Sequence, residues 1–444
     1  MKAYSLQQFA DAMSGTLPKG GGDLVISAGV STDTRKMAEG ALFVALKGER
    51  YDAHNFLDQA VASGAGALVV QEAVSLPKEV PVILVKDTLQ ALQDLAKWYR
   101  HELGILVVAI SGSNGKTSTK DFTCSVLSQR FRVNATLGNL NNHIGLPLTV
   151  LATKTDDEVG VFEMGMNHAG ELAPLCEIAR PDISIITNVG TAHIEFMGSR
   201  DAIGHEKGTL ARALGEKGTL LVPWDCEYLD DYRATTAGTV IAVGAGSIRA
   251  ENVVAGVAGS TFDLVVDNLG RIATSISVPG RHMVSNALLA AGAGVVLGMT
   301  LEEISVGLEN ASLTSGRLRQ FESNGVTVFD DTYNANPESI LAALQTLADH
   351  PTQGGRTAVL GEMAEQGEHA GPAYLRIGAL AGDLGLRLVS VGAEAAGMNA
   401  LHHFETVEEA SGWLSGNTHS GDLVLFKGSR AAAIERVMNL AYPE

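Results

Sequence analysis

The N-terminal part of the chain predicts a strand followed by a long amphipathic helix. Residues 80–85 (VPVILV) form an apolar run of strand length, as expected for a buried strand. In residues 89–103 the apolar side chains recur at helical spacing, and Thr88 is a residue type suited to capping the helix. The stretch before residue 80 mixes short strand and helix patterns. We therefore place a first domain boundary near residue 86.

From residue 105 onward, strand-like runs alternate with helical patterns. After the apolar run that begins there, residues 159–165 (VGVFEMG) and 182–190 (DISIITNVG) are β-rich and are followed by polar or glycine-rich residues. An alanine-rich helix is expected within residues 279–299. This alternation is typical of a parallel sheet whose strand-end loops bind ligands.

The last third of the chain repeats the alternation on a smaller scale. Strand-like runs occur at residues 326–331, 356–363, 386–392 and 422–429. We predict an α/β protein of three domains: a smaller α/β N-terminal domain, a central doubly wound domain and a Rossmann-like C-terminal domain. Their expected bounds are 1–85, 86–313 and 314–444.

Composition and charge narrow the class of protein. The chain has 444 residues, of which 45% are hydrophobic and 18% charged, so it can bury ample core. A net charge of −18 argues against a general nucleic-acid or anionic-membrane surface. The three cysteines form no paired motif, and no apolar run has the length of a signal peptide or membrane span. We expect a cytoplasmic protein with free thiols and no transmembrane segment.

The strongest chemical signal is residues 105–120, ILVVAISGSNGKTSTK. A β-branched run ends in a small-residue turn that leads through Gly115, Lys116 and Thr117 into a helical pattern. Backbone N–H groups of such a turn surround phosphate oxygens, the lysine reaches the outer phosphates, and the hydroxyl binds magnesium. The usual spacing places a glycine where this chain has Ile110. A glycine-rich turn without a ligand is the alternative, but strand, turn and helix together favour ATP or GTP binding.

Further ionisable residues stand near the predicted strand ends. Glu163 finishes a strand, which is where a magnesium ligand downstream of a phosphate loop is expected. His193 and Lys207 follow the next strand, as a possible metal ligand and a possible chemically active pocket residue. Each has a simpler reading: a solvated carboxylate, a hydrogen-bonded loop histidine and a solvated helix lysine. Likewise Asn141 and Asn142 suit either a turn or the recognition of a polar substrate.

Several of these segments together resemble the ATP-dependent Mur ligases, over almost the whole chain. These enzymes join amino acids or a dipeptide to a UDP-linked muramoyl precursor of peptidoglycan. The segments that carry the resemblance are SGSNGKTST, TLGNLNNHIGLP, EMGMNHAGEL, TNVGTAHIEFMGS with Lys207, and PGRHMVSNALLAA.

Within that family the string DDTYNANPESI (330–340) resembles the branch that adds D-alanyl-D-alanine to UDP-N-acetylmuramoyl-tripeptide. The Asp-Asn-Pro-Arg motif of the forms that add diaminopimelate is absent from the chain. The resemblance implies an ADP-forming ligase that works through an acyl phosphate, with these two molecules as its substrates. We expect a monomer. The third residue of the accepted peptide, diaminopimelate or lysine, is left open.

The resemblance also implies roles for single residues. It places Thr117 and Glu163 on a first magnesium ion, and His193 near a second one served by a carbamylated Lys207. Only a neutral amine reacts with carbon dioxide, so such a site must lower the lysine pKa from about 10.4 or trap the product. The residues that would act catalytically are Lys116, Glu163, His193 and Lys207.

Binding residues follow from the same resemblance. The ATP contacts would be Gly112, Ser113, Asn114, Gly115, Lys116, Thr117, Ser118, Asn286, Arg317 and Asp331, with Asn286 on the adenine side. The UDP-sugar would lie against Ser31, Thr32, Asp33, Arg35, Lys47 and His54.

Three other functions compete with this interpretation. A related ligase could act on another amino acid or on folate. A kinase would share the phosphate loop without an amine-donor pocket. A non-catalytic nucleotide-binding module would need no metal chemistry, which fits poorly with Lys116, Thr117, Glu163, His193 and Lys207 occurring together.

Overall fold

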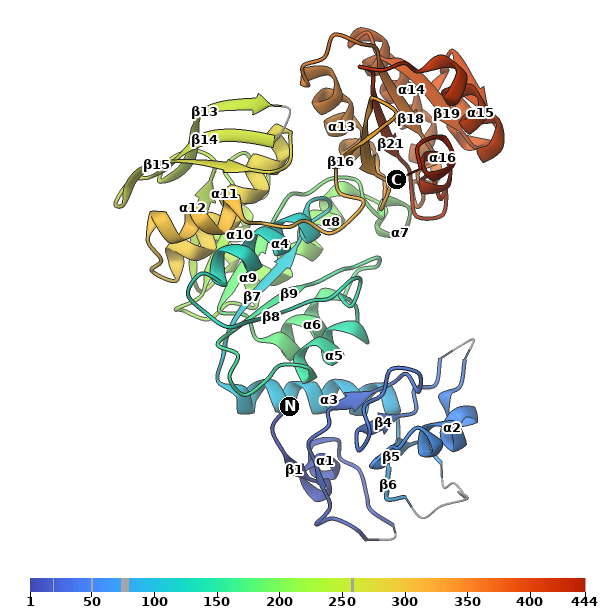
Figure 1. The fold of residues 1–444 in the computed structure, drawn as a ribbon. Helices are drawn as coiled ribbons and strands as arrows, with labels where there is room; N and C mark the ends of the chain where they lie inside the picture. Colours follow the sequence, from blue (N-terminus) through green and yellow to red (C-terminus); the bar gives the residue numbers. More distant parts are fainter. Residues whose placement is uncertain (19, 49–50, 73–79, 257–258, 444) are drawn as a thin grey trace.

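The computed structural model describes residues 1–18, 20–48, 51–72, 80–256 and 259–443 (Figure 1). It confirms an α/β protein of three domains, which follow one another from the N-terminal domain (blue) through the central domain to the C-terminal domain (orange to red). The N- and C-terminal domains lie at opposite ends of the central one. The exact boundaries at residues 86 and 314 stay predictions.

The N-terminal domain is built on a parallel sheet of order β3-β4-β5-β6. Its inner strands β4 and β5 are buried on both faces, which explains their continuous apolar sequences. A short antiparallel pair, β1 with β2, precedes the sheet. The element bounds are β1 Tyr4–Ser5, α1 Leu6–Ala12, β2 Val25–Ile26, β3 Val30–Ser31, β4 Leu42–Val44, η1 Ala53–Phe56, α2 Leu57–Ala62, β5 Ala67–Val70 and β6 Val82–Leu84.

Helix α3 (Thr88–Leu103) connects the N-terminal and central domains. The helix cap is Asp87, whose carboxylate accepts from the Gln90 amide at 2.9 Å, so the expectation that Thr88 caps the helix is wrong by one residue. The apolar face of α3 joins side chains of α1 to side chains of α5 and α6 in one continuous core. The N-terminal and central domains therefore share one hydrophobic core, which runs along this helix.

The central domain has the predicted parallel sheet, of order β12-β11-β10-β7-β9-β8. In β7, Val107 and Ala109 pack into the core shared with α3, whereas Val108 and Ile110 face α4 and α11 on the other side. The strand bounds are β7 Leu106–Ser111, β8 Val133–Ala135, β9 Val159–Glu163, β10 Ile183–Ile186, β11 Thr219–Pro223 and β12 Thr239–Val243. The helices are α4 Lys116–Leu127, α5 Gly145–Leu151, α6 Leu172–Ala179, α7 Ile194–Met197, α8 Arg200–Lys207, α9 Thr209–Arg212, α10 Leu229–Thr235, α11 Arg281–Val296 and α12 Leu301–Glu309.

An antiparallel sheet of order β13-β14-β15 extends from the central domain and packs on α11 and α12. Its strands are β13 Ile248–Gly256, β14 Gly259–Val266 and β15 Gly270–Ile276. The sequence analysis did not predict it. Along β14 the side chains of Phe262, Leu264 and Val266 alternate toward the core, which is the period that indicates a half-buried strand.

The C-terminal domain is a second doubly wound sheet, of order β16-β17-β21-β18-β19-β20. All pairs are parallel except β16 with β17, and the antiparallel edge strand β16 was not predicted. The strand bounds are β16 Arg319–Ser323, β17 Val326–Asp331, β18 Arg356–Leu360, β19 Arg387–Val391, β20 His402–Phe404 and β21 Leu423–Lys427. The helices are α13 Pro337–Asp349, η2 Gly367–His369, α14 Ala370–Asp383, η3 Glu394–Met398, α15 Val407–Asn417 and α16 Glu435–Ala441.

Candidate active site

A cavity of about 630 Å³ lies at the carboxyl ends of the central parallel strands, where the C-terminal domain meets the central domain. Its walls come from the loop before α4, the ends of β9 and β10, the start of α11, and the segment between β17 and α13. Ligands in open α/β sheets bind at this edge. The topology therefore brings most of the predicted nucleotide residues to one place.

The phosphate loop of the cavity is held open by two glycines. Gly112 has φ +154°, and a Cβ there would lie 1.8 Å from the Thr187 hydroxyl oxygen. Gly115 has φ +77° and is the N-cap residue of α4, and no side chain of the described residues caps that helix. The first N–H groups of α4 are thus available to an anion, as a phosphate site requires.

A loop that follows β10 supports the phosphate loop from behind. The Asn114 amide donates to Asn188 Oδ1 at 2.9 Å, and the Ser113 amide donates to the Asn188 carbonyl at 3.1 Å. In return, the Gly190 amide donates to Ser113 Oγ at 2.9 Å. Asn188 was missed as a site residue, although it lies in the TNVG string that the sequence analysis singled out.

Glu163 ends β9 inside the cavity and is only 3% exposed. Its carboxylate accepts from the Thr117 hydroxyl at 2.9 Å and from the Asn141 amide at 2.7 Å. The structure therefore brings together three residues that are far apart in sequence, and the solvated-surface alternative for Glu163 is wrong. A hydroxyl beside a carboxylate is the oxygen donor set that Mg²⁺ prefers.

Two cations face this donor set. The Lys116 ammonium donates to the Gly112 carbonyl at 2.8 Å. Burial lowers the pKa of Lys116, Glu163 opposes that shift and Arg317 adds to it. Arg317 comes from the segment leading into the C-terminal domain, donates to the Thr117 hydroxyl at 3.3 Å and lies over the Tyr333 ring at 4.1 Å. Positive charge thus converges where phosphates would be bound.

Lys207 ends α8 and is 1% exposed. Burial, and then the charge of Lys116, hold the pKa of its amine well below the usual value. Within the part of the chain that the structure describes, this amine forms no hydrogen bond or ion pair, and the charge of Glu206 opposes the lowering of its pKa. Lys207 is not one of the residues that line the cavity, yet it is not the solvated helix lysine of the simpler reading.

His193 precedes α7 with φ +65° and lines the cavity. Its Nδ1 atom hydrogen-bonds to the carboxylate of Glu365, which comes from the C-terminal domain. That hydrogen bond holds the pKa of Glu365 below its ordinary value despite partial burial. Sequence reasoning missed Glu365, because nothing local in GEMAEQGEH links it to a loop 172 positions earlier.

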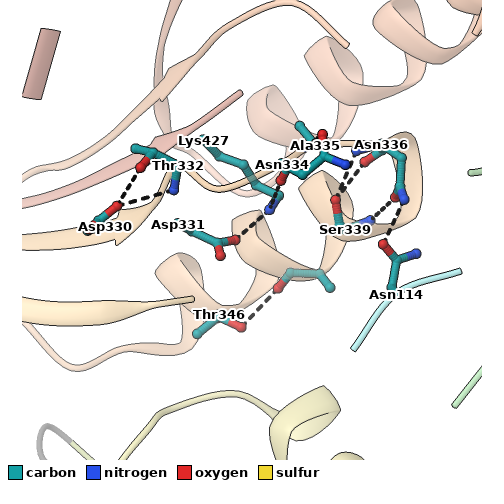
Figure 2. A network of polar contacts seen from close by, with 11 residues as sticks. Asn114, Asp330, Asp331, Thr332, Asn334, Ala335, Asn336, Ser339, Thr346 and Lys427 are labelled. Carbon is teal, nitrogen blue, oxygen red and sulfur yellow. Dashed lines mark hydrogen bonds and ion pairs between the residues drawn. The ribbon is translucent and has the colours of Figure 1, made fainter. Parts of the chain in front are cut away.

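The segment between β17 and α13 adds a polar network that reaches the phosphate loop (Figure 2). The buried Lys427 ammonium contacts Asp331 at 2.6 Å and donates to the Asn334 carbonyl at 3.0 Å. Asn336 caps α13 and donates from its amide to Asn114 Oδ1 at 2.7 Å. A side chain of the C-terminal domain therefore donates a hydrogen bond directly to a residue of the phosphate loop.

Two of the predicted asparagines have different surroundings: Asn286 packs against the phosphate loop, whereas Asn142 stabilises a turn. Asn286 is 5% exposed and lies against Gly115, where a Cβ would meet its Oδ1 at 2.6 Å. Asn142 lines the cavity, but its Oδ1 accepts the amides of Ile144 and Gly145, which is the turn role of the simpler reading. Nearby, burial lowers the pKa of His282 to about 4, with Asp331 opposing the shift.

The predicted UDP-sugar residues are not at this cavity. They lie in the N-terminal domain, where three of them contact one another: Asp33 accepts from the Arg35 guanidinium at 2.8 Å, and the Ser31 hydroxyl donates to the Asp33 carbonyl at 3.1 Å. His54 Nδ1 contacts Asp52 at 2.6 Å, and its Nε2 accepts from the Gln71 amide at 3.0 Å. The full set is Ser31, Thr32, Asp33, Arg35, Lys47 and His54.

The described residues contain no group of three or more His, Cys, Asp or Glu side chains that could hold a metal ion by themselves. Within the same residues, no helix combines the length and apolar character needed to cross a bilayer.

Profiles of the Mur ligase family match three stretches of the chain. The profile described as Mur ligase family, catalytic domain, matches residues 27–100, and that of the Mur ligase middle domain matches residues 110–294. The profile described as Mur ligase, glutamate ligase domain, matches residues 316–430.

Curated relatives match over nearly the full length. The chain is 36% identical over 457 residues to UDP-N-acetylmuramoyl-tripeptide–D-alanyl-D-alanine ligase of Escherichia coli, covering 99% of this chain and 98% of that one. It is 35% identical to the ligase of the same name from Bacillus subtilis, covering 98% and 97%.

Solved structures agree with the sequence relatives. A crystal structure of MurF from Acinetobacter baumannii superimposes with a TM-score of 0.93 at 32% identity, over 99% of both chains. MurF from Thermotoga maritima, in complex with ADP, superimposes with a TM-score of 0.84 at 27% identity, over 93% of this chain and 96% of that one. The chain therefore belongs to the Mur ligase family, in the branch of the UDP-N-acetylmuramoyl-tripeptide–D-alanyl-D-alanine ligases.

Proposed function

We propose that this chain is an ATP-dependent, ADP-forming ligase that adds D-alanyl-D-alanine to UDP-N-acetylmuramoyl-tripeptide during synthesis of the peptidoglycan precursor. The observation that carries the proposal is the single cavity in which the phosphate loop, the Thr117–Glu163 pair and the 330–340 segment meet. The relatives that match over the full chain carry the name of this ligase.

The first step makes a poor electrophile reactive. A terminal carboxylate oxygen of the tripeptide attacks the γ-phosphorus of ATP, the bond to the β,γ-bridging oxygen breaks, and ADP leaves behind an acyl phosphate. Lys116 and the N-terminus of α4 offset the repulsion between carboxylate and phosphate. Mg²⁺, when bound, would add Lewis-acid charge stabilisation at the phosphates.

The second step forms the peptide bond. The neutral amine of D-alanyl-D-alanine attacks the acyl carbon, a tetrahedral intermediate forms, and inorganic phosphate leaves as the proton of the amine is lost. No side-chain nucleophile is required, so positioning and charge neutralisation supply the rate. Water must be excluded from the acyl phosphate, and the C-terminal domain covers this side of the cavity.

The metal assignments belong to the same proposal. Thr117 and Glu163 would hold a first Mg²⁺, and His193 with a carbamylated Lys207 would serve a second. The buried Lys207 supports carbamylation, because its lowered pKa keeps the amine in the neutral form that reacts with carbon dioxide. Supplying ¹³C-bicarbonate and recording the ¹³C spectrum tests this. A carbamate signal that Lys207→Ala abolishes would support the assignment, and its absence from the wild type would refute it.

Phosphate release from ATP and Mg²⁺ tests the reaction itself, with UDP-N-acetylmuramoyl-tripeptide supplied in the presence and absence of D-alanyl-D-alanine. We expect release that depends on both substrates, and a pentapeptide product by mass. Phosphate release that requires a single amino acid in place of D-alanyl-D-alanine would indicate a ligase with a different amine substrate. Release without any amine acceptor would indicate a kinase.

Three further expectations accompany the activity. We propose a hinge near residue 314, a monomer and a cytoplasmic location. Scattering curves that do not change when an ATP analogue and the UDP-precursor are added would contradict the hinge. Light scattering that gives twice the mass of one chain would contradict the monomer. A tagged chain that sediments with membranes would contradict the location.

A further inference from the structure

The loop that carries His193 is bound by a residue from another domain. Glu365 accepts a hydrogen bond from His193 Nδ1 through its side chain. Its backbone carbonyl accepts from the Glu195 amide at 3.3 Å, so both parts of Glu365 contact the start of α7. His193 and Glu365 both adopt positive φ, +65° and +61°, which is uncommon for residues other than glycine. The tertiary contact thus involves two unusual backbone positions.

The hydrogen bond fixes the chemistry of the imidazole. An ionised carboxylate can only accept, so His193 Nδ1 must carry the proton. In a neutral ring the lone pair then lies on Nε2, the nitrogen that remains free to bind a metal ion. Metal-binding histidines commonly donate their other ring N–H to a carboxylate, which orients the ring and raises its basicity.

We propose that Glu365, a residue of the C-terminal domain, is a positioning residue that orients His193 for a divalent cation. The inference rests on the proposed function, in which His193 serves the second Mg²⁺. Glu365 itself acts through His193 and does not touch the reacting atoms.

A neighbouring contact separates positioning from docking. Glu338, in the first turn of α13, accepts from the Thr191 amide at 3.0 Å and from the Thr191 hydroxyl at 3.1 Å. This contact joins the same two domains through the same loop, two residues before His193, without touching the imidazole. Loss of Glu338 therefore weakens docking and leaves the ring orientation to Glu365.

The chain also offers a matched control for the loss of charge. Glu368 lies three residues after Glu365, in η2, and is exposed. Its side chain makes no hydrogen bond or ion pair within the described residues, so its replacement removes a carboxylate from the same segment and leaves the bond between Glu365 and His193 in place. We expect Glu368→Ala to behave as the wild type.

Manganese titration followed by electron paramagnetic resonance tests the proposal on the full chain, with a non-hydrolysable ATP analogue and the UDP-tripeptide present. We expect two Mn²⁺ sites in the wild type. Glu365→Ala should weaken one of them by about 10–100-fold and raise the KM for Mg²⁺ more than it lowers kcat. Glu365→Gln, whose amide oxygen can still accept from Nδ1, should recover most of that affinity.

Two results would overturn the proposal. One is wild-type Mn²⁺ binding in Glu365→Ala, with its thermal unfolding unchanged. The other is an equal loss of affinity in Glu338→Ala, which would assign the effect to docking alone. Failure of the proposed function is a separate outcome: the wild type itself would make no pentapeptide product.

Discussion

The phosphate loop and the predicted UDP-sugar residues of the N-terminal domain arrange their polar groups in opposite ways. At the phosphate loop, buried residues from β9, the loop after β10 and the C-terminal domain converge on a cavity. The predicted UDP-sugar residues, by contrast, bond within the N-terminal domain: Arg35 to Asp33, and His54 to Asp52 and the Gln71 amide.

The difference shows which region is preformed. Burial fixes the central-domain part of the phosphate site before any ligand arrives, because an unpaired polar group there would be costly. The Arg35 side chain is 79% exposed, so it can exchange Asp33 for a ligand at little cost. We therefore expect substitutions at the phosphate loop to change catalysis or stability strongly, and substitutions around Asp33 to change mainly substrate affinity.

The largest effect should come from removing the phosphate-loop cation. Lys116→Met keeps the length of the side chain but removes its charge, and we expect kcat/KM to fall by about 10³-fold. Arg35→Met should raise the KM for the UDP-tripeptide by about tenfold and leave kcat nearly unchanged. Steady-state kinetics with each substrate varied measures both. Similar losses of kcat in Lys116→Met and Arg35→Met would contradict the expectation that the first residue serves catalysis and the second serves substrate affinity.

The next effect concerns the backbone of the phosphate loop. In Gly112→Ala the new Cβ would collide with the Thr187 hydroxyl, and we expect a loss of roughly 2–4 kcal/mol in unfolding free energy. Gly104→Ala is the matched control, because Gly104 also has positive φ but no atom within 4 Å of its would-be Cβ. It should cost about 1–2 kcal/mol. Denaturant unfolding that gives equal losses would show that close packing against Thr187 is unimportant.

A smaller effect is a pH dependence of stability from His282. Its pKa falls from 6.5 to about 4 in the folded chain, so between these values the unfolded chain binds a proton that the folded chain does not. Stability is unaffected above pH 6.5 and is lost as the pH falls toward 4, by roughly 2 kcal/mol after allowance for partial exposure. His282→Gln should flatten the unfolding free energy between pH 5 and 6.5.

The Asp33–Arg35 pair should respond at a different pH. Arg35 lowers the pKa of Asp33 to about 2, so its contribution is present above pH 3.8 and is lost only as the pH falls toward 2. The two regions can thus be distinguished in one titration series. If Asp33→Asn changed the pH dependence of the unfolding free energy between pH 5 and 6.5 relative to the wild type, this separation would be contradicted.

The smallest effect is expected at His54. Both of its ring nitrogens are engaged within the N-terminal domain, so His54→Phe should cost about 1 kcal/mol of stability and change kcat little. A several-fold rise in the KM for the UDP-tripeptide would indicate that His54 positions neighbouring residues that bind the substrate. A large fall in kcat would instead show that His54 takes part in catalysis, which would contradict the prediction.

The fold could be predicted wherever the signal was local. The apolar run at 326–331 became β17 with the same bounds, and Glu163 ends β9 as its position after VGVF indicated. The antiparallel strands β13 to β15 were missed because their alternating pattern was not separated from the surrounding loops. The cap of α3 was missed by one residue, since Asp87 and Thr88 are both suitable caps.

The site could be predicted only in part, for a physical reason. Gly112, Lys116 and Thr117 lie on one turn, so their spacing alone indicates a phosphate loop. Glu365 and Asn336 act across a domain interface, where a contact depends on how two domains pack and leaves no local pattern. Lys207 was recognised by resemblance, whereas its burial, which explains the lowered pKa, is visible only in the structure.

The core shared through α3 has a consequence for the length of the substrate. A helix of 16 residues spans about 24 Å and, packed on both sides, holds the N-terminal domain at a set distance from the phosphate loop. On the proposed function, a nucleotide anchored at one end must reach the γ-phosphate with its last carboxylate. A peptide shorter by one residue would fall about 3.5 Å short. The enzyme would then select the number of residues in its substrate by reach, without reading each side chain.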